Sequence, residues 1–195
     1  LDQGDTISEI GSGIVVVSSG RNNIAYGAAD NADILYIGAC QNSCFDSKDG
    51  EDGIFVRTNS DEPLTHAFSV SSSTVQGVTI NPNDSTQAFF IDDSRVYLTN
   101  DTGANWSEIT GNLNNFGRLR SIAFLPDNEN NRLVVGSNKG VFIADQLDGY
   151  NNWSIAASGI PNSPIFELDY DSGSGRLVAG TMGRGSFVLT YPVGN

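Results

Sequence analysis

Four short apolar runs recur along the chain at nearly constant spacing, and this repeat restricts the possible folds more than any other feature. The runs begin at Ile34, Ala88, Leu133 and Leu177, so their starts lie 54, 45 and 44 residues apart. Each run is bounded by polar turn residues and accompanied by further short apolar runs. A period of roughly 40–50 residues with four short strands per unit indicates an all-β chain folded as a β-propeller.

The repeat divides a single domain, 1–195, into four approximate units, 20–70, 71–110, 115–157 and 160–195. The fourth unit ends without a fourth strand, whereas 1–19 contains one apolar run, Ile14 to Val17, that fits a strand completing another blade. Two arrangements follow. This strand completes the last unit and closes a small four-bladed ring, or the chain is the C-terminal part of a six- to eight-bladed propeller. The chain starts at Leu1 without a signal-peptide pattern, which favours a mature or excised piece.

One turn in the second unit carries a motif with defined structural roles. The stretch Thr99-Asn100-Asp101-Thr102-Gly103-Ala104-Asn105-Trp106 lies between two strand-like runs. Asp101 can accept backbone N–H bonds within its own turn, with a weaker hydroxyl bond from Thr99. Gly103 permits a positive φ, and Trp106 can cover the hairpin with its ring. We therefore expect a tight hairpin between the two outer strands of a blade.

These positions resemble the Asp-box (BNR) β-propellers, which include sialidases, sortilin-type receptors and xyloglucan-cleaving glycosidases. The resemblance implies that Asp101 is structural, that ligands meet the loops at one end of the blades, and that the ring has six or more blades. The other units depart from the pattern. The first has Thr58-Asn59-Ser60-Asp61, and the third keeps Asp148 and Trp153 but has Tyr150 in place of the glycine.

Composition fits many short strands joined by turns, with 22 glycines and only 17 % charged residues. The formal charge is −13, from 23 acidic and 10 basic residues, and such a field repels nucleic-acid phosphates. No apolar run approaches the length that spans a bilayer. We expect a secreted or cell-surface protein with no nucleic-acid partner.

The loop from Ala39 to Gly53 is much longer than its counterparts in the other units and carries unusual chemistry. Cys40 and Cys44 are compatible with a local disulfide in an oxidising compartment, or with two free thiols. Zinc is disfavoured because a second ligand pair is missing. The acidic residues Asp46, Asp49, Glu51 and Asp52 offer oxygen ligands for calcium, although a solvated acidic loop explains them equally.

A second candidate site lies where the third unit begins. The loop from Gly111 to Arg120 offers Phe116, Arg118 and Arg120, and Arg184 could join them from the fourth unit. Such a face could stack on a sugar and bond its hydroxyls or a carboxylate. The alternative is that Phe116 packs between blades while the arginines pair with surplus acids.

No catalytic constellation is evident. A sialidase needs an arginine triad with a tyrosine–glutamate pair, His66 lacks a nucleophile motif, and 23 acids do not single out a carboxylate pair. The main hypothesis is a non-catalytic extracellular module that binds glycan or protein through this loop face. One alternative is the C-terminal portion of a propeller glycoside hydrolase, with an unseen carboxylate facing Asp92 or Asp93. Another is a structural subunit of a surface layer or filament, joined to further blades or other copies.

Overall fold

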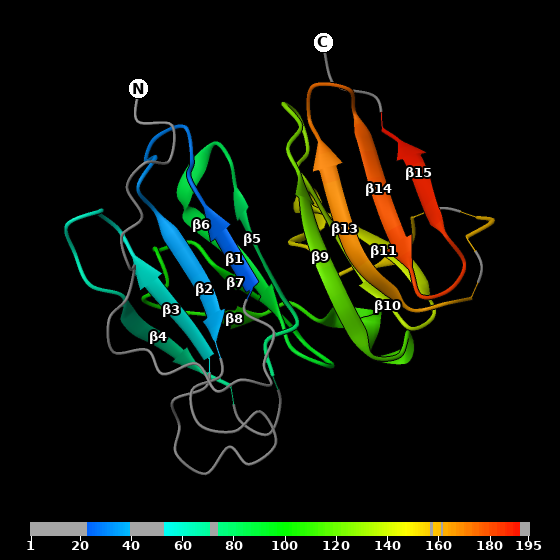
Figure 1. Cartoon of the computed structure of the whole chain (residues 1–195), viewed down its shortest axis with the longest axis horizontal. Helices are drawn as coiled ribbons and strands as arrows, with labels where there is room; N and C mark the ends of the chain where they lie inside the picture. The colour runs from blue at the N-terminus through cyan, green and yellow to red at the C-terminus, as the bar shows by residue number, and fades with distance from the viewer. Residues whose placement is uncertain (1–22, 40–52, 71–73, 157, 161, 192–195) are drawn as a thin grey trace.

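The computed structural model describes residues 23–39, 53–70, 74–156, 158–160 and 162–191 (Figure 1). Within them the chain is built from short antiparallel strands and two 3-10 helical turns, η1 (Gly111–Asn115) and η2 (Gln146–Asp148). The expected all-β class is confirmed. No helix in these ranges has the length and apolarity needed to cross a bilayer.

The strands form four sheets, which we call blades 1 to 4, each following the chain from an inner strand outwards. Blade 1 contains β1 (Asn23–Tyr26), β2 (Leu35–Ala39), β3 (Gly53–Arg57) and β4 (Thr65–Ser69), and blade 2 contains β5 (Gly77–Asn81), β6 (Asp84–Ile91), β7 (Val96–Thr99) and β8 (Ser107–Glu108). Blade 3 contains β9 (Leu119–Leu125), β10 (Arg132–Ser137), β11 (Gly140–Asp145) and β12 (Ser154–Ile155), and blade 4 contains β13 (Ile165–Asp171), β14 (Arg176–Thr181) and β15 (Ser186–Thr190).

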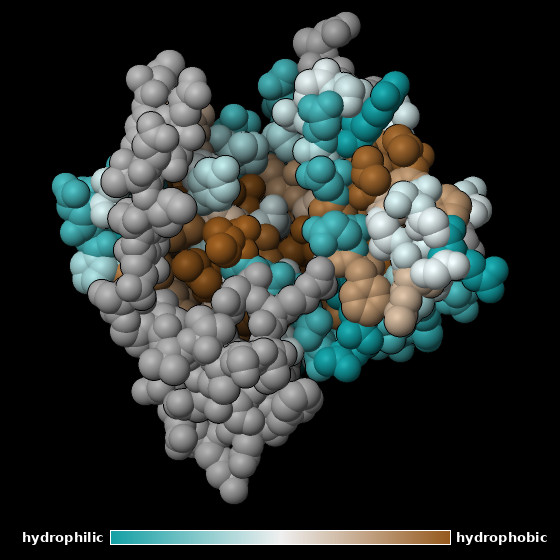
Figure 2. Space-filling model, viewed as in Figure 1, coloured by the Kyte–Doolittle hydropathy of each residue, from teal (hydrophilic) through white to brown (hydrophobic). Residues whose placement is uncertain are grey.

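The blades stand side by side around an open centre, with the inner strands β1, β5, β9 and β13 packed in sequence (Figure 1). Blades 1 to 3 have four strands each, and blade 4 has three among the described residues. Figure 2 shows a hollow between the two arms of the molecule, with hydrophobic residues at its base. The inner strands therefore line one central groove that is open on one side.

Alternation along the strands gives each blade two faces, and both faces of the middle blades are buried. On β6, Phe90 packs with Tyr36 and Val56 in the cluster between blades 1 and 2. Its neighbour Phe89 packs with Phe124 in the cluster between blades 2 and 3. A third cluster joins Val134 to Leu177 between blades 3 and 4. Because the second strands β6 and β10 contact apolar side chains on both sides, they appear in the sequence as continuous apolar runs.

The second strand of blade 2 begins earlier than its apolar run predicts. β6 starts at Asp84 rather than Ala88, because Asn81 and Asp84 pair directly across a tight turn at Pro82-Asn83. The buried side chains in this polar half bond one another. Asn81 donates to Gln87 at 3.0 Å, and Gln87 donates to Asn100 at 2.9 Å. Hydropathy alone does not predict a strand that buries amides, since their burial requires such partners.

The motif turn between β7 and β8 is held by hydrogen bonds among its own residues. Thr99 Oγ1 donates to Asp101 Oδ1 at 2.8 Å and accepts from the Gly103 N–H at 3.0 Å. Asp101 Oδ1 also accepts from the Asn105 N–H at 2.8 Å. Gly103 has a φ of 84°, and the Trp106 indole donates to its carbonyl at 3.1 Å. All four motif residues thus stabilise this turn.

Several predictions from the sequence lie outside the described residues. They are the strand at Ile14 to Val17, the pairing of Cys40 with Cys44, and the calcium ligands Asp46, Asp49, Glu51 and Asp52. In the part of the chain that the structure describes, no group of three or more His, Cys, Asp or Glu side chains is placed to hold a metal ion. The disulfide and the calcium site remain predictions.

Candidate functional site: the loop face around Arg120

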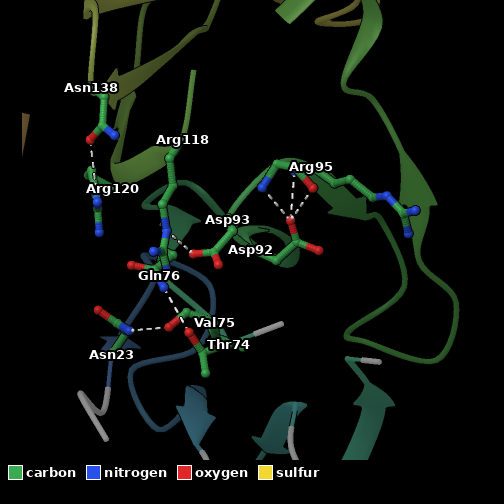
Figure 3. Close-up of polar contacts among 11 residues, drawn as sticks. Asn23, Thr74, Val75, Gln76, Asp92, Asp93, Arg95, Arg118, Arg120 and Asn138 are labelled. Atoms are coloured by element: carbon green, nitrogen blue, oxygen red, sulfur yellow. Dashed lines mark hydrogen bonds and ion pairs between the residues drawn. The ribbon is translucent and has the colours of Figure 1, made fainter. Parts of the chain in front are cut away.

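The candidate site lies at the end of the groove where the inner strands begin. Successive strands in a blade are antiparallel, so the loops that enter each inner strand meet the turns that leave each second strand at this end. Figure 3 shows the polar residues gathered there, among them Asp93, Arg118, Arg120 and Asn138. They come from blades 2 and 3, and the face is therefore shared between neighbouring blades.

The loop entering β9 is fastened between two turns. The Leu119 N–H donates to the carbonyl of Asp93 at 2.9 Å, and the Asn138 N–H donates to the carbonyl of Arg118 at 2.9 Å. Backbone bonds on both sides hold the start of β9 in place, so the direction of the two arginine side chains is defined by the fold.

Arg118 is paired with an acid. Its Nε donates to Asp93 Oδ1 at 2.7 Å, and the two side chains are 46 % and 32 % exposed. An ion pair with this much exposure contributes at most about 1 kcal/mol to stability. Its main effect is on charge, because it neutralises one of the two arginines on this face.

Arg120 has different partners. Its Nε donates to Asn138 Oδ1 at 2.9 Å, and its guanidinium lies over the ring of Phe166 in blade 4, 5.2 Å from the centroid. Burial is the main cause that lowers the pKa of Arg120 from its ordinary value, followed by the neighbouring charge of Arg118, with Asp93 acting in the opposite direction. Arg120 is therefore a partly desolvated cation whose contacts are an amide and an aromatic ring.

The groove beneath this cation has a volume of about 520 Å³. Its wall is formed by consecutive residues of all four inner strands, from Asn23 to Tyr26, Gln76 to Ile80, Arg120 to Phe124 and Phe166 to Tyr170. Arg120 is its cation, and Glu167 and Asp169 on β13 are its acids. A ligand at the loop face would therefore meet a positive group at the mouth and acidic groups on the neighbouring strand β13.

Two of the four predicted ligand-face residues, Arg118 and Arg120, lie together, and the other two do not join them. Phe116 packs on Phe142 with ring centroids 4.2 Å apart, in the cluster between blades 2 and 3, which is the alternative arrangement for this residue. Arg184 is exposed on the β14–β15 turn, where Thr181 and Gly185 hydrogen-bond each other. Among the described residues, no hydrogen bond or ion pair connects it to Arg120.

The acids on this face have structural partners. Asp92 is 3 % exposed, and its Oδ1 accepts from the N–H groups of Ser94 and Arg95, each at 2.7 Å. Asp93 is the partner of Arg118. The hypothesis of a glycoside hydrolase whose catalytic residues lie partly on another segment stays a prediction; Asp92 forms the turn and Asp93 the ion pair.

Phe166 is the site residue that sequence reasoning missed. It lies in the run from Ile165 to Tyr170, which the sequence predicts as an inner strand with alternating faces. That alternation predicts that Phe166 shares a face with Leu168 and Tyr170. It gives no information on whether a residue from another blade lies above the ring.

Comparison with family models gives no match, and neither does comparison with curated proteins. Solved structures do match. The GH74 enzyme of Niastella koreensis has a TM-score of 0.66 at 14 % identity, over 86 % of this chain and 28 % of that one. The β-propeller domain of Myceliophteria thermophila Cps50 (Swd1) gives 0.63 at 14 %, over 87 % and 52 %. YCF48 bound to D1 peptide gives 0.59 at 15 %, over 93 % and 58 %.

The chain thus spans less than two thirds of the length of each of these proteins. Identities near 15 % support a shared fold and nothing about ligand or reaction. Together with the four sheets around a central groove, the similarity establishes that this chain folds as blades of a β-propeller.

Proposed function

We propose that this chain is a non-catalytic recognition module, extracellular or at the cell surface, whose loop face binds a carboxylate-bearing glycan or protein ligand. The observation that carries the proposal is Arg120. Its guanidinium is held in place by Asn138 and Phe166 at the mouth of the groove, whereas Arg118 beside it is neutralised by Asp93. The planar guanidinium donates in a fixed fork that suits a carboxylate.

The charge of the whole chain bears on the range of this interaction. A formal charge of −13 repels an acidic ligand at long distance, but salt screens such fields beyond about 8–10 Å. Attraction to Arg120 then acts at contact, within a partly desolvated site. The module would therefore bind its ligand tightly only where the carboxylate reaches Arg120, which gives selectivity without fast electrostatic capture.

The location outside the cell rests on the composition, which is acidic and rich in glycine, and on the pair Cys40 and Cys44 in a long loop. The motif from Thr99 to Trp106 supports descent from the Asp-box propellers, in which this turn is structural. The lack of catalysis rests on the engagement of Asp92 and Asp93 in the turn and the ion pair.

The test is binding by isothermal calorimetry to oligosaccharides with and without a uronic acid, and to acidic and neutral peptides. Arg120→Gln should weaken binding of the acidic ligand about tenfold to a hundredfold, since hydrogen bonds to a charged group contribute about 1.5–3 kcal/mol. Arg176→Gln is the matched control, because Arg176 begins β14 at the end of that strand away from the loop face. This variant should change affinity less than twofold. Equal affinity of wild type and Arg120→Gln for every ligand would contradict the proposal, as would hydrolysis of the oligosaccharides by the chain.

Arg184→Gln tests whether the binding site extends over blade 4. Arg184 is exposed on the same face and has no link to the cluster, so its loss should have little effect on a short ligand. A loss that grows with oligosaccharide length would place Arg184 in an extended site over blade 4.

A further inference from the structure

Each of the first three blades buries one row of cross-strand partners against the next blade in the chain. We call the face turned toward the next blade the trailing face and the opposite one the leading face. The trailing rows run from inner to third strand and are paired residue by residue. They are Ala25–Tyr36–Val56, Thr79–Phe89–Leu98 and Ala123–Val134–Ile143.

Blade 4 carries the same row on a face that is open. The row is Asp169–Val178–Val188, paired in the same register. Val178 is 39 % exposed and Val188 is 61 % exposed, whereas the equivalent Val134 is fully buried against blade 4. Figure 2 shows hydrophobic side chains on this arm of the molecule. The trailing face of blade 4 thus has the apolar residues of a blade-to-blade contact.

Blade 1 carries the complementary row on its leading face. Blades 2 to 4 place Val78–Phe90–Tyr97, Ile122–Val135–Phe142 and Leu168–Ala179–Phe187 at these positions. In blade 1 the row is Ile24–Ile37–Phe55. Ile24 is 58 % exposed and Tyr26, two residues along the same strand, is 75 % exposed. Phe55 on β3 is 5 % exposed, so this face is open at its inner end and not at its third strand.

The two open faces have opposite charge. Glu167, Asp169 and Asp171 alternate along β13 on the trailing face of blade 4 and are exposed, with the single cation Arg176 paired opposite Asp171 on the described part of this face. Alternation along β3 puts Arg57 on the leading face of blade 1, where its Nε is buried without a hydrogen bond. His66 pairs with Phe55 on the adjacent strand β4, and the two rings are 5.0 Å apart. A buried donor without a partner is costly, so an acid from an incoming face would stabilise it.

We propose that two copies of this chain assemble head to tail, the trailing face of blade 4 in each copy packing on the leading face of blade 1 in the other. A twofold axis along the groove gives two identical contacts and closes the ring. A second copy is the occupant because the matching rows and the opposite charge both occur on this chain. This assembly is independent of the ligand proposed above, since mass reports it without any ligand.

The experiment is solution mass by light scattering after size exclusion, for the wild type and for variants of each face. The wild type should have twice the chain mass of 20.7 kDa. Val188→Asp and Ile24→Asp should each give monomers, since each places a charge in both contacts of the pair. Leu147→Asp is the control, because Leu147 is 78 % exposed on η2, away from both faces, and its mass should not change. Circular dichroism should show native strand content in all variants.

Mixing the two monomeric variants gives the decisive result. One contact of the mixed pair then joins an intact Val188 to an intact Ile24, whereas the other carries both aspartates and stays open, so a heterodimer held by one contact should form that neither variant forms alone. Three results would each overturn the proposal. They are a wild type that stays monomeric up to about 100 μM, a regular polymer, and the lack of a heterodimer on mixing.

Discussion

The outer turns of blades 2 and 3 occupy the same place in their sheets and are stabilised in different ways. In blade 2, Thr99, Asp101 and Gly103 bond one another, and the Trp106 indole donates within the turn. In blade 3, Tyr150 stands where Gly103 does, with a φ of 59°, and its ring is 2 % exposed against Phe89 of blade 2. The first turn relies on polar bonds and the second on a buried aromatic ring.

The tryptophans show the same division. The Trp153 indole donates to the carbonyl of Ile109 at 3.3 Å, and its backbone N–H donates to Asn112 Oδ1 at 2.7 Å. Both partners lie in the segment that leaves blade 2. The motif residue that closes a turn in blade 2 therefore fastens two blades together in blade 3. A repeat can lose its polar consensus where contact with the preceding blade takes over its role.

The largest effect should come from Tyr150→Ala, which removes the ring that supports the blade 3 turn. Truncation of a buried aromatic costs about 3–5 kcal/mol. Tyr150→Gly should be less damaging than Tyr150→Ala by about 1 kcal/mol, because glycine adopts the left-handed backbone without penalty. Urea unfolding followed by tryptophan fluorescence measures both. If both variants unfold at the wild-type midpoint, the ring does not support this turn.

Next in size is Gly111→Ala, which acts where the two blades meet. A Cβ on Gly111 would lie 1.9 Å from the carbonyl oxygen of Asn151, and its φ is 50°. Backbone strain and overpacking together should cost about 3 kcal/mol. Gly103→Ala is the comparison within blade 2, where the new Cβ meets a methyl of Val56 at 2.9 Å, and it should cost about 1–2 kcal/mol. If Gly103→Ala loses more free energy of unfolding than Gly111→Ala, the expected order of the two substitutions is wrong.

The difference between these turns also shows how much of the fold can be predicted from the sequence. The period of the apolar runs predicts four antiparallel sheets, because a strand buried on both faces must be apolar throughout. The motif around Asp101 predicts its own turn, because all its bonds are local. The role of Tyr150 could not be predicted, since its ring is stabilised by Phe89, which is distant in sequence and brought near only by the packing of two blades.

The candidate site is limited in the same way. Arg118 and Arg120 are recognisable as a pair at the start of an inner strand, and the structure places both at the loop face, where Arg120 lines the groove. Phe116 is near them in sequence, yet it packs on Phe142 because the core between blades 2 and 3 accepts an aromatic ring there. Phe166 completes the site from another blade. Site residues that lie in one loop can be predicted from the sequence. A site that combines residues of two blades can be recognised only once the fold is known.

The third prediction concerns pH and separates the polar turn from the aromatic one. Hydrogen bonds from the Asn105 side chain and backbone, and then from Thr99, hold the pKa of the Asp101 carboxyl below its ordinary value of 3.8. A lowered folded-state pKa gives stability that is present above the unfolded-state pKa and is lost as pH falls through the folded-state value. The urea midpoint of Asp101→Asn should therefore lie below that of the wild type. This difference should be largest near neutral pH and should shrink below about pH 4.

The matched control is Asp148→Asn in blade 3. Asp148 holds the same place relative to its tryptophan but is exposed, and within the described residues its carboxylate makes no hydrogen bond. This variant should follow the wild type across the whole pH range. A gap of the same size and pH dependence in both variants would mean that general charge, rather than the local bonds of Asp101, sets the effect.

The smallest change should come from Tyr150→Phe. The Tyr150 hydroxyl is buried without a hydrogen-bond partner, and burial raises the pKa of this phenol. Removing a polar group that is already unsatisfied should leave the free energy of unfolding unchanged or slightly higher. Tyr36→Phe is the opposite case, because the Tyr36 hydroxyl donates to the carbonyl of Ser85 at 2.9 Å in the core between blades 1 and 2. That variant should lose about 1–2 kcal/mol, since the Ser85 carbonyl would be left without this donor. If Tyr150→Phe loses as much as Tyr36→Phe, a water or another group satisfies the Tyr150 hydroxyl, and the blade 3 turn depends on polar bonding after all.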